Sequence, residues 1–165
     1  MQGAVRRRSI ATAFICRALV GADAPGKPAK RTNTQAHKQT NAMKKILIVE
    51  DQLQVLSVMR RILEHDGYEV LAATDISTAK RLLLSAPVDL LLSDIDLPDG
   101  SGLELCGWTR SQPALQAAKV ILCSGRLGPD LERQALEAGA VAFIAKPFGL
   151  DQFRATIRSH VPPEP

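Results

Sequence analysis

The sequence predicts an α/β domain in which helices cover both faces of a parallel sheet. Short apolar runs alternate five times with segments that carry apolar residues at helical spacing, all between residues 43 and 161. Strands that alternate with helices pair in parallel, because each helix carries the chain back across the sheet. The 165 residues, of which 45% are hydrophobic, suffice for one core but hardly for two.

Five short apolar runs are predicted as strands. Each contains at most one charged residue, and such near-continuous apolar character is typical of strands that are buried on both faces. In chain order the predicted strands cover residues 46–49, 68–73, 88–93, 119–123 and 141–145.

The segments between and after these runs are predicted as helices. Gly67 and Gly139 follow the first and the fourth as C-terminal stops, and Pro129 begins the fourth. Five such units predict the flavodoxin-like (βα)5 fold, a doubly wound parallel sheet with the strand order 2-1-3-4-5. The apolar stripes of the five helices are Val55, Leu56, Met59, Ile62 and Leu63; Ile76, Ala79 and Leu83; Leu103, Leu105, Cys106 and Trp108; Leu131, Ala135 and Ala138; and Leu150, Phe153, Ile157 and Val161.

The net charge has opposite signs in the N-terminal quarter and in the rest of the chain. Residues 1–42 contain eight basic residues and one acidic residue, a net charge of +7, whereas residues 43–165 contain 13 basic and 16 acidic residues, a net charge of −3. Residues 1–42 also lack sustained periodicity, so we expect a basic, disordered N-terminal extension; a translation start at Met43 is an alternative. Residues 43–161 form the predicted domain, and residues 162–165 form a short Pro-rich tail.

Composition argues against several classes of protein. No apolar run approaches the roughly 18 residues that a membrane span needs. The excess of basic over acidic residues lies outside the predicted domain, which argues against nucleic-acid binding by that domain, and no DNA-binding domain is expected after the last helix. Cys16, Cys106 and Cys123 have neither metal-ligand spacing nor an even-numbered disulfide framework, so we expect a cytoplasmic protein.

Polar side chains follow four of the five predicted strands. Glu50 and Asp51 follow the first strand, Asp94 the third, Ser124 the fourth and Lys146 the fifth. In the order 2-1-3-4-5 these strand ends are neighbours at the edge of the sheet where open α/β sheets bind ligands. Asp94 alone is compatible with a solvated acidic turn, and the two acids after the first strand with a helix cap. The coincidence of all five residues indicates one common site.

These residue types suit phosphoryl transfer onto a carboxylate. Clustered acids need a cation, and hard oxygen ligands favour Mg²⁺ or the related Mn²⁺. In this chemistry Asp94 attacks in line as the nucleophile. Ser124 offers a hydroxyl and Lys146 a point charge to the remaining phosphoryl oxygens.

The same residues resemble the response-regulator receiver domains of two-component signalling, of the single-domain chemotaxis or phosphorelay type. The resemblance covers about residues 44–160, and the spacings of 30 from Asp94 to Ser124 and 22 from Ser124 to Lys146 agree with that family. The motifs that carry it are Ile46-Leu-Ile-Val-Glu-Asp51, Asp94 with Pro98 and Gly102, Val120-Ile-Leu-Cys-Ser-Gly125, and Lys146-Pro147-Phe148.

The resemblance implies a metal site and a phosphoacceptor. Asp94 is the phosphoacceptor, and Glu50 and Asp51 hold Mg²⁺ or Mn²⁺ together with Asp94 and the backbone carbonyl of Asp96. Asp99 is expected in the turn that follows. Glu50 stands where the family more often has Asp, which leaves phosphorylation intact but puts its turnover rate in doubt.

The resemblance also implies a switch. Ser124 corresponds to the switch hydroxyl and Phe143 to the switch aromatic, and the Lys146–Pro147 peptide bond is expected to be cis. Gly125 replaces the commoner Ala, a second mild departure.

The implied partners are proteins. A sensor histidine kinase or a histidine phosphotransfer protein supplies the phosphoryl group, and a downstream protein target binds the face formed by the fourth helix, fifth strand and fifth helix. The protein is then no enzyme beyond its own phosphorylation and dephosphorylation.

Three other functions remain open. One is a receiver-like interaction module that acts without phosphorylation. Another is a haloacid-dehalogenase-type phosphatase, whose Asp-x-Asp is matched by Asp94 and Asp96. In that family, however, the nucleophile strand precedes the metal acids in the chain, whereas here Glu50 and Asp51 come first. The third places the function in residues 1–42, as an arm for nucleic acid or an anionic surface.

Overall fold

The computed structural model describes residues 43–126 and 128–164, and the predicted N-terminal extension lies outside them. The described chain forms a five-stranded sheet with the order β2-β1-β3-β6-β7, in which every pairing is parallel. This confirms the predicted flavodoxin-like fold and its order 2-1-3-4-5. The strands are β1 (Lys45–Val49), β2 (Glu69–Ala73), β3 (Leu90–Asp94), β6 (Lys119–Ser124) and β7 (Ala142–Ala145).

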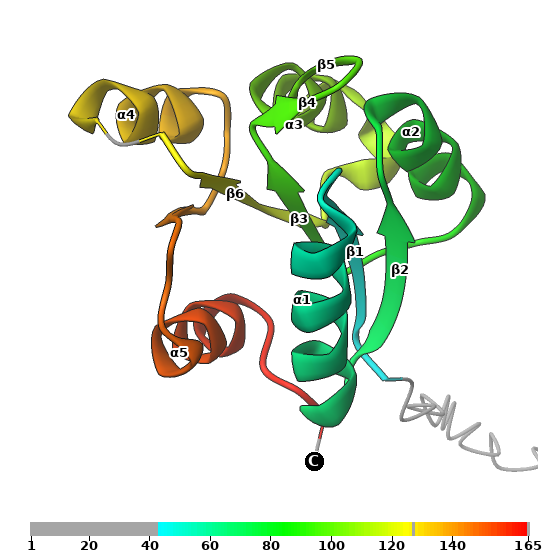
Figure 1. The fold of residues 1–165 in the computed structure, drawn as a ribbon. Coiled ribbons are helices and arrows are strands. Elements are labelled where there is room, and N and C mark those ends of the chain that lie inside the picture. The colour runs from blue at the N-terminus through cyan, green and yellow to red at the C-terminus, as the bar shows by residue number, and fades with distance from the viewer. Residues whose placement is uncertain (1–42, 127, 165) are drawn as a thin grey trace, which may run out of the picture. The chain divides into compact units, whose positions relative to one another are not determined.

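Helices cover both faces of the sheet (Figure 1). Successive residues of each strand point to opposite faces, so Leu47 and Val49 lie in one core layer while Ile46 and Ile48 lie in the other. The layer of Leu47 also contains buried residues of α2 (Ile76–Ser85), α3 (Gly102–Ser111) and α4 (Pro129–Glu137). The layer of Ile46 contains those of α1 (Leu53–His65) and α5 (Leu150–His160).

Two helices end next to the glycines that were predicted as their C-terminal stops. Gly67 and Gly139 have φ of 92° and 98°, a left-handed conformation that glycine adopts without steric cost. The helix before each of them therefore ends where the sequence indicates. The residues that follow α1 contact α5 and its C-cap: Tyr68 Oη donates a 2.6 Å hydrogen bond to the carbonyl of Val161, and Asp66 pairs with Arg154.

Strand boundaries differ from the prediction by one or two residues. The β3 strand begins at Leu90 rather than at residue 88, since the side chain of Asp89 accepts a 2.8 Å hydrogen bond from the backbone N–H of Lys45 where the strand pairing begins. Two features were not predicted: an antiparallel hairpin of β4 (Asp96–Leu97) with β5 (Gly100–Ser101), and the short 3₁₀ helix η1 (Pro113–Leu115). Elements of two or three residues are too short to produce a periodic pattern.

None of the helices in the described part of the chain has the length and apolar character needed to cross a membrane.

Candidate functional site

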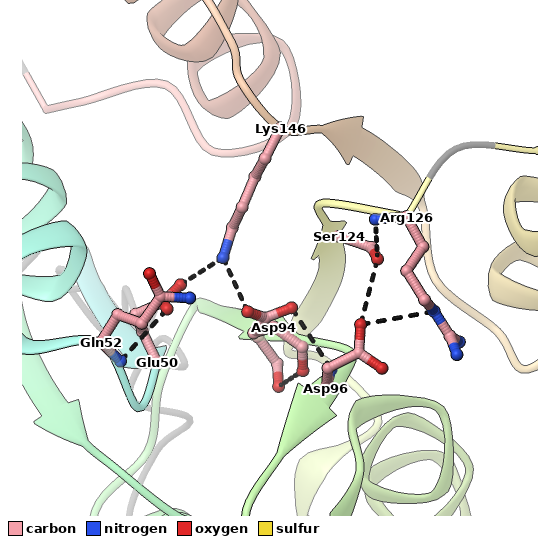
Figure 2. Close-up of polar contacts among 8 residues, drawn as sticks. Glu50, Gln52, Asp94, Asp96, Ser124, Arg126 and Lys146 are labelled. Carbon is pink, nitrogen blue, oxygen red and sulfur yellow. Dashed lines mark hydrogen bonds and ion pairs between the residues drawn. The ribbon is translucent and has the colours of Figure 1, made fainter.

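The candidate site lies where the central strands end. Asp94 and Ser124 are the last residues of β3 and β6, while Glu50 directly follows β1 and Lys146 directly follows β7. The sheet order places β3 between β1 and β6, so Asp94 is in the middle of this row (Figure 2). Asp94, Glu50 and Ser124 are buried, with exposed fractions of 6%, 0% and 0%.

Lys146 joins two of the acids. Its Nζ donates hydrogen bonds to Asp94 Oδ2 at 2.7 Å and to Glu50 Oε2 at 2.5 Å. The second oxygen of each carboxylate faces a backbone donor: Asp96 N lies 3.3 Å from Asp94 Oδ1, and Gln52 N lies 3.3 Å from Glu50 Oε1. Glu50 is thus turned into the site, and the N-cap of α1 is Gln52, without a side-chain capping bond. The helix-cap alternative for Glu50 is therefore not supported.

Burial and the neighbouring charges act in opposite directions on the pKa values of Glu50 and Lys146. Burial raises the pKa of Glu50, although the hydrogen bond and the charge of Lys146 counteract the shift. Burial also opposes the charge of Lys146, but the hydrogen bonds and charges of Asp94 and Glu50 outweigh it and raise the lysine pKa. Lys146 is therefore a firmly protonated cation beside Asp94.

Three carboxylates form a cluster that could hold a metal ion. Glu50, Asp51 and Asp94 each offer an oxygen, and these oxygens lie within 4.8 Å of one another. Asp51 is exposed, whereas the other two are buried. An all-carboxylate set of this size suits a hard divalent cation, so the residues present fit the predicted Mg²⁺ or Mn²⁺.

A second polar group lies on the other side of Asp94 (Figure 2). Ser124 Oγ lies 3.4 Å from Asp96 Oδ2 and accepts a 3.0 Å hydrogen bond from the backbone N–H of Arg126. The Arg126 side chain turns back, with its Nε 3.4 Å from the same Asp96 oxygen. Arg126 was not predicted as a site residue, because it is a single exposed charge in a loop. Its position two residues after Ser124 was the one sequence feature that could have indicated it.

The remaining predicted site residues lie in β7, directly after it, and in the turn between β4 and β5. Phe143 is half-buried in β7 and packs against the core layer of α2, α3 and α4, as Leu131 and Ala138 of the α4 segment also do. The Lys146–Pro147 peptide bond is cis. Asp99 lies in the turn between β4 and β5, as expected, but it also accepts hydrogen bonds from the first residues of α2, which the sequence did not indicate.

Cys123 is the direct neighbour of Asp94 in the sheet. Burial raises the pKa of its thiol to about 12, so the group stays protonated at neutral pH. Cys123 is therefore a small buried side chain, as the apolar run predicted, and no competing nucleophile.

Comparisons with known proteins agree with this geometry. The family model of the response regulator receiver domain matches residues 46–158. The transcriptional regulatory protein KdpE of Mycobacterium tuberculosis is 36% identical over 116 residues, which are 70% of this chain and 50% of that protein. The polar-differentiation response regulator DivK of Brucella anthropi is 31% identical over 118 residues, 72% of this chain and 96% of that protein.

A solved structure agrees as well. The CheY-like receiver domain protein of Methanospirillum hungatei superposes with a TM-score of 0.67 at 31% identity, over 72% of this chain and 93% of that one. The chain therefore spans about half the length of KdpE but nearly all of DivK and of this solved domain.

Proposed function

This chain belongs to the response regulator receiver domain family, and on that premise we propose that it accepts a phosphoryl group on Asp94 and passes the signal on through protein contacts. The observation that carries the proposal is the position of Asp94 at the centre of the strand ends, with Lys146 Nζ 2.7 Å from one of its oxygens. A structural acid in a surface turn would need neither this burial nor a lysine from another strand.

The proposed donor is a phosphohistidine of a histidine kinase or a phosphotransfer protein. A carboxylate oxygen of Asp94 forms the new O–P bond as the N–P bond of the donor breaks, and the electron pair of that bond remains on the imidazole nitrogen, which takes up a proton. Lys146 holds the carboxylate in place and offsets negative charge as the phosphoryl group arrives. Ser124, buried at the end of the adjacent strand β6, supplies a hydroxyl for a phosphoryl oxygen.

Glu50, Asp51 and Asp94 would hold Mg²⁺, or Mn²⁺ in its place, with the backbone carbonyl of Asp96 as a further ligand. Such a cation, when bound, offsets the charge of the acids and of the phosphoryl oxygens. Without it, the charge of Lys146 is shared between two carboxylates. We therefore expect phosphorylation to depend on a divalent cation.

An apolar groove beside Lys146 supports a protein as the donor. The groove is lined by Val55, Val58 and Met59 of α1 and by Pro147 and Phe148 after β7, with a volume of about 640 Å³. Val58 is 57% exposed and Leu53, in the first turn of α1, is 66% exposed. A helix that presents its histidine to Asp94 could bury these side chains.

The proposed output is a second protein contact. Phosphorylation would draw Ser124 toward the phosphoryl group, and Phe143 would turn toward the space that Ser124 leaves. The surface of α4, β7 and α5 would change with it and shift an existing two-state equilibrium. A protein target is favoured over DNA, because residues 43–165 carry a net charge of −3.

The proposal makes this protein a phosphoacceptor with self-dephosphorylation and no other enzyme activity. We also propose a cytoplasmic location, which is supported by the two cysteines among residues 43–126 and 128–164: Cys106 and Cys123 are buried and form no disulfide.

The test is labelling with acetyl phosphate and Mg²⁺. Wild type is expected to gain one hydroxylamine-labile phosphoryl group, Asp94→Ala none, and the control Asp130→Ala, altered on the exposed surface of α4, the same amount as wild type. Absence of labelling in wild type, or full labelling of Asp94→Ala, would contradict the proposal. Steady release of phosphate from many monoesters would favour a phosphatase instead.

A further inference from the structure

We propose that Asp99 is a positioning residue for phosphorylation: its carboxylate fastens the loop that carries Asp94 and Asp96 to the N-terminus of α2. The inference rests on the proposed function, because it assigns Asp99 a role in the reaction at Asp94. It does not place Asp99 in contact with the reacting atoms.

The carboxylate of Asp99 reaches across 22 and 23 positions of sequence to α2. Its Oδ1 accepts a 2.8 Å hydrogen bond from the backbone N–H of Ile76, and its Oδ2 accepts bonds from the backbone N–H and the hydroxyl of Ser77, at 3.0 and 2.9 Å. Ile76 and Ser77 begin α2, where backbone N–H groups have no partner within the helix. One side chain therefore satisfies two backbone N–H groups and one hydroxyl of another element.

The loop that Asp99 fastens, between β3 and α3, also has backbone hydrogen bonds of its own. It leaves β3 after Asp94, forms the β4–β5 hairpin with Asp99 in the turn, and returns at Gly102, whose N–H donates a 2.8 Å hydrogen bond to the carbonyl of Ile95. The hairpin also rests on α2, because a Cβ added at Gly100 would lie 2.9 Å from Cδ1 of Ile76. Asp99 adds directional bonds to this contact and so fixes the hairpin relative to the helix.

Asp96 is the residue through which Asp99 would act. It lies at the base of the hairpin, its N–H is 3.3 Å from Asp94 Oδ1, and its backbone carbonyl is the proposed metal ligand. A hairpin that moves relative to α2 would move that carbonyl and that N–H together. Loss of Asp99 should therefore weaken metal binding and slow phosphorylation while Asp94 itself is unchanged.

Asp75 provides a matched control at the same helix end. It is the N-cap of α2, and its Oδ1 accepts a 2.7 Å hydrogen bond from the N–H of Thr78, within its own segment. Asp75 and Asp99 both serve as caps of α2, but only Asp99 of these two comes from the hairpin. A merely structural role of Asp99 would make Asp75→Ala and Asp99→Ala equivalent.

The experiment compares these two variants at a temperature where both are folded. Mg²⁺ binding is measured by calorimetry without any phosphodonor, and the labelling rate is measured against Mg²⁺ concentration. We expect Asp99→Ala to weaken Mg²⁺ binding about tenfold, the effect typical of a residue that orients a metal ligand, and to need correspondingly more Mg²⁺ for half-maximal labelling. Asp75→Ala should bind Mg²⁺ like wild type. Asp99→Asn, which keeps one acceptor oxygen, should lie between Asp99→Ala and wild type.

A third measurement is independent of metal and donor. Amide hydrogen exchange of residues 96–101 in the metal-free protein should accelerate in Asp99→Ala and not in Asp75→Ala. Equal Mg²⁺ affinity and equal exchange in the two variants would overturn the proposal and leave Asp99 a helix cap. If Asp99→Ala does not fold, Asp99→Asn and Ser77→Ala decide in its place. A wild-type protein that is not labelled at all would instead refute the proposed function.

Discussion

The Nζ atom of Lys146 lies 2.7 Å from a carboxylate oxygen of Asp94, although 52 positions separate the two residues in the sequence. The same ammonium contacts Glu50, whose side chain is fully buried. A parallel sheet produces this contact, since it brings the carboxyl ends of β1, β3 and β7 to one edge with only β6 between the last two. Lys146 is thus the cation around which the acidic site is assembled.

Lys146→Met should slow labelling by acetyl phosphate while leaving the phosphoacceptor in place. The substitution keeps most of the side-chain volume and removes the charge beside Asp94. A hydrogen bond to a charged group contributes about 1.5–3 kcal/mol, so we expect the rate to fall about 10- to 150-fold. Lys119→Met is the control, because Lys119 is exposed at the opposite end of β6. An unchanged rate in Lys146→Met would show that the lysine contributes only to folding.

Gly102→Ala should disturb the site through the backbone. A Cβ at this position would overlap the carbonyl oxygen of Asp94, and backbone cannot rotate away as a side chain can. Overpacking of this kind typically destabilises by about 1–3 kcal/mol, and here the strain falls on the phosphoacceptor. We expect a lower midpoint of denaturant unfolding together with slower labelling.

Gly107→Ala is the matched control for Gly102→Ala. It lies in the same helix, α3, and an added Cβ would meet nothing within 4 Å. The substitution should leave stability unchanged or raise it by about 0.4–1 kcal/mol. Equal unfolding midpoints for the two variants would contradict the close approach of Gly102 to Asp94.

The sequence predicted the parts of this site that depend on strand order. Asp94, Ser124 and Lys146 were found because each follows an apolar run, and a parallel sheet leaves little choice about where such residues meet. Arg126 and the cap formed by Asp99 were not found. Both depend on where one exposed side chain turns in three dimensions, and no periodic pattern records that. The β4–β5 hairpin was missed for a related reason, because two-residue strands have no period.

The loss of stability at acidic pH should depend on two carboxylates, those of Asp75 and Asp99, which accept hydrogen bonds from the first residues of α2. Hydrogen bonds from backbone N–H groups, of Thr78 for Asp75 and of Ile76 for Asp99, lower the pKa of each below the ordinary value of 3.8. As the pH falls, Asp75 and Asp99 therefore become protonated in the unfolded protein before they do so in the folded protein. The stabilisation is therefore complete above the ordinary value and is lost as the pH drops through the lower, folded-state value.

Removal of both carboxylates should make the free energy of unfolding depend less steeply on pH in the acidic range. We expect the free energy of unfolding of Asp75→Asn/Asp99→Asn to fall less steeply below about pH 4 than that of wild type, with each single variant in between. Urea unfolding followed by circular dichroism at a series of pH values measures the slopes. A double variant with the slope of wild type would mean that these groups do not contribute to the pH dependence.

Arg126→Ala should affect the chemistry more than the fold. Its ion pair with Asp96 is exposed on both sides, and such pairs contribute less than about 1 kcal/mol to stability. Without Arg126, however, the charge of Asp96 is uncompensated beside an incoming phosphoryl group. A unit charge at such distances in water corresponds to about 1 kcal/mol, so labelling should slow by about fivefold at low salt.

Salt and a second arginine separate this effect from a general change of surface charge. In about 1 M salt, where the Debye length is about 3 Å, Arg126→Ala and wild type should label at nearly the same rate, because solvent ions replace the missing countercharge. Arg133→Ala removes an equally exposed arginine that pairs with Asp130 and Glu137 on α4, away from the site. Its labelling rate should match wild type at either salt concentration. A difference between Arg126→Ala and wild type that persists at high salt would point to a steric role of Arg126 over Ser124.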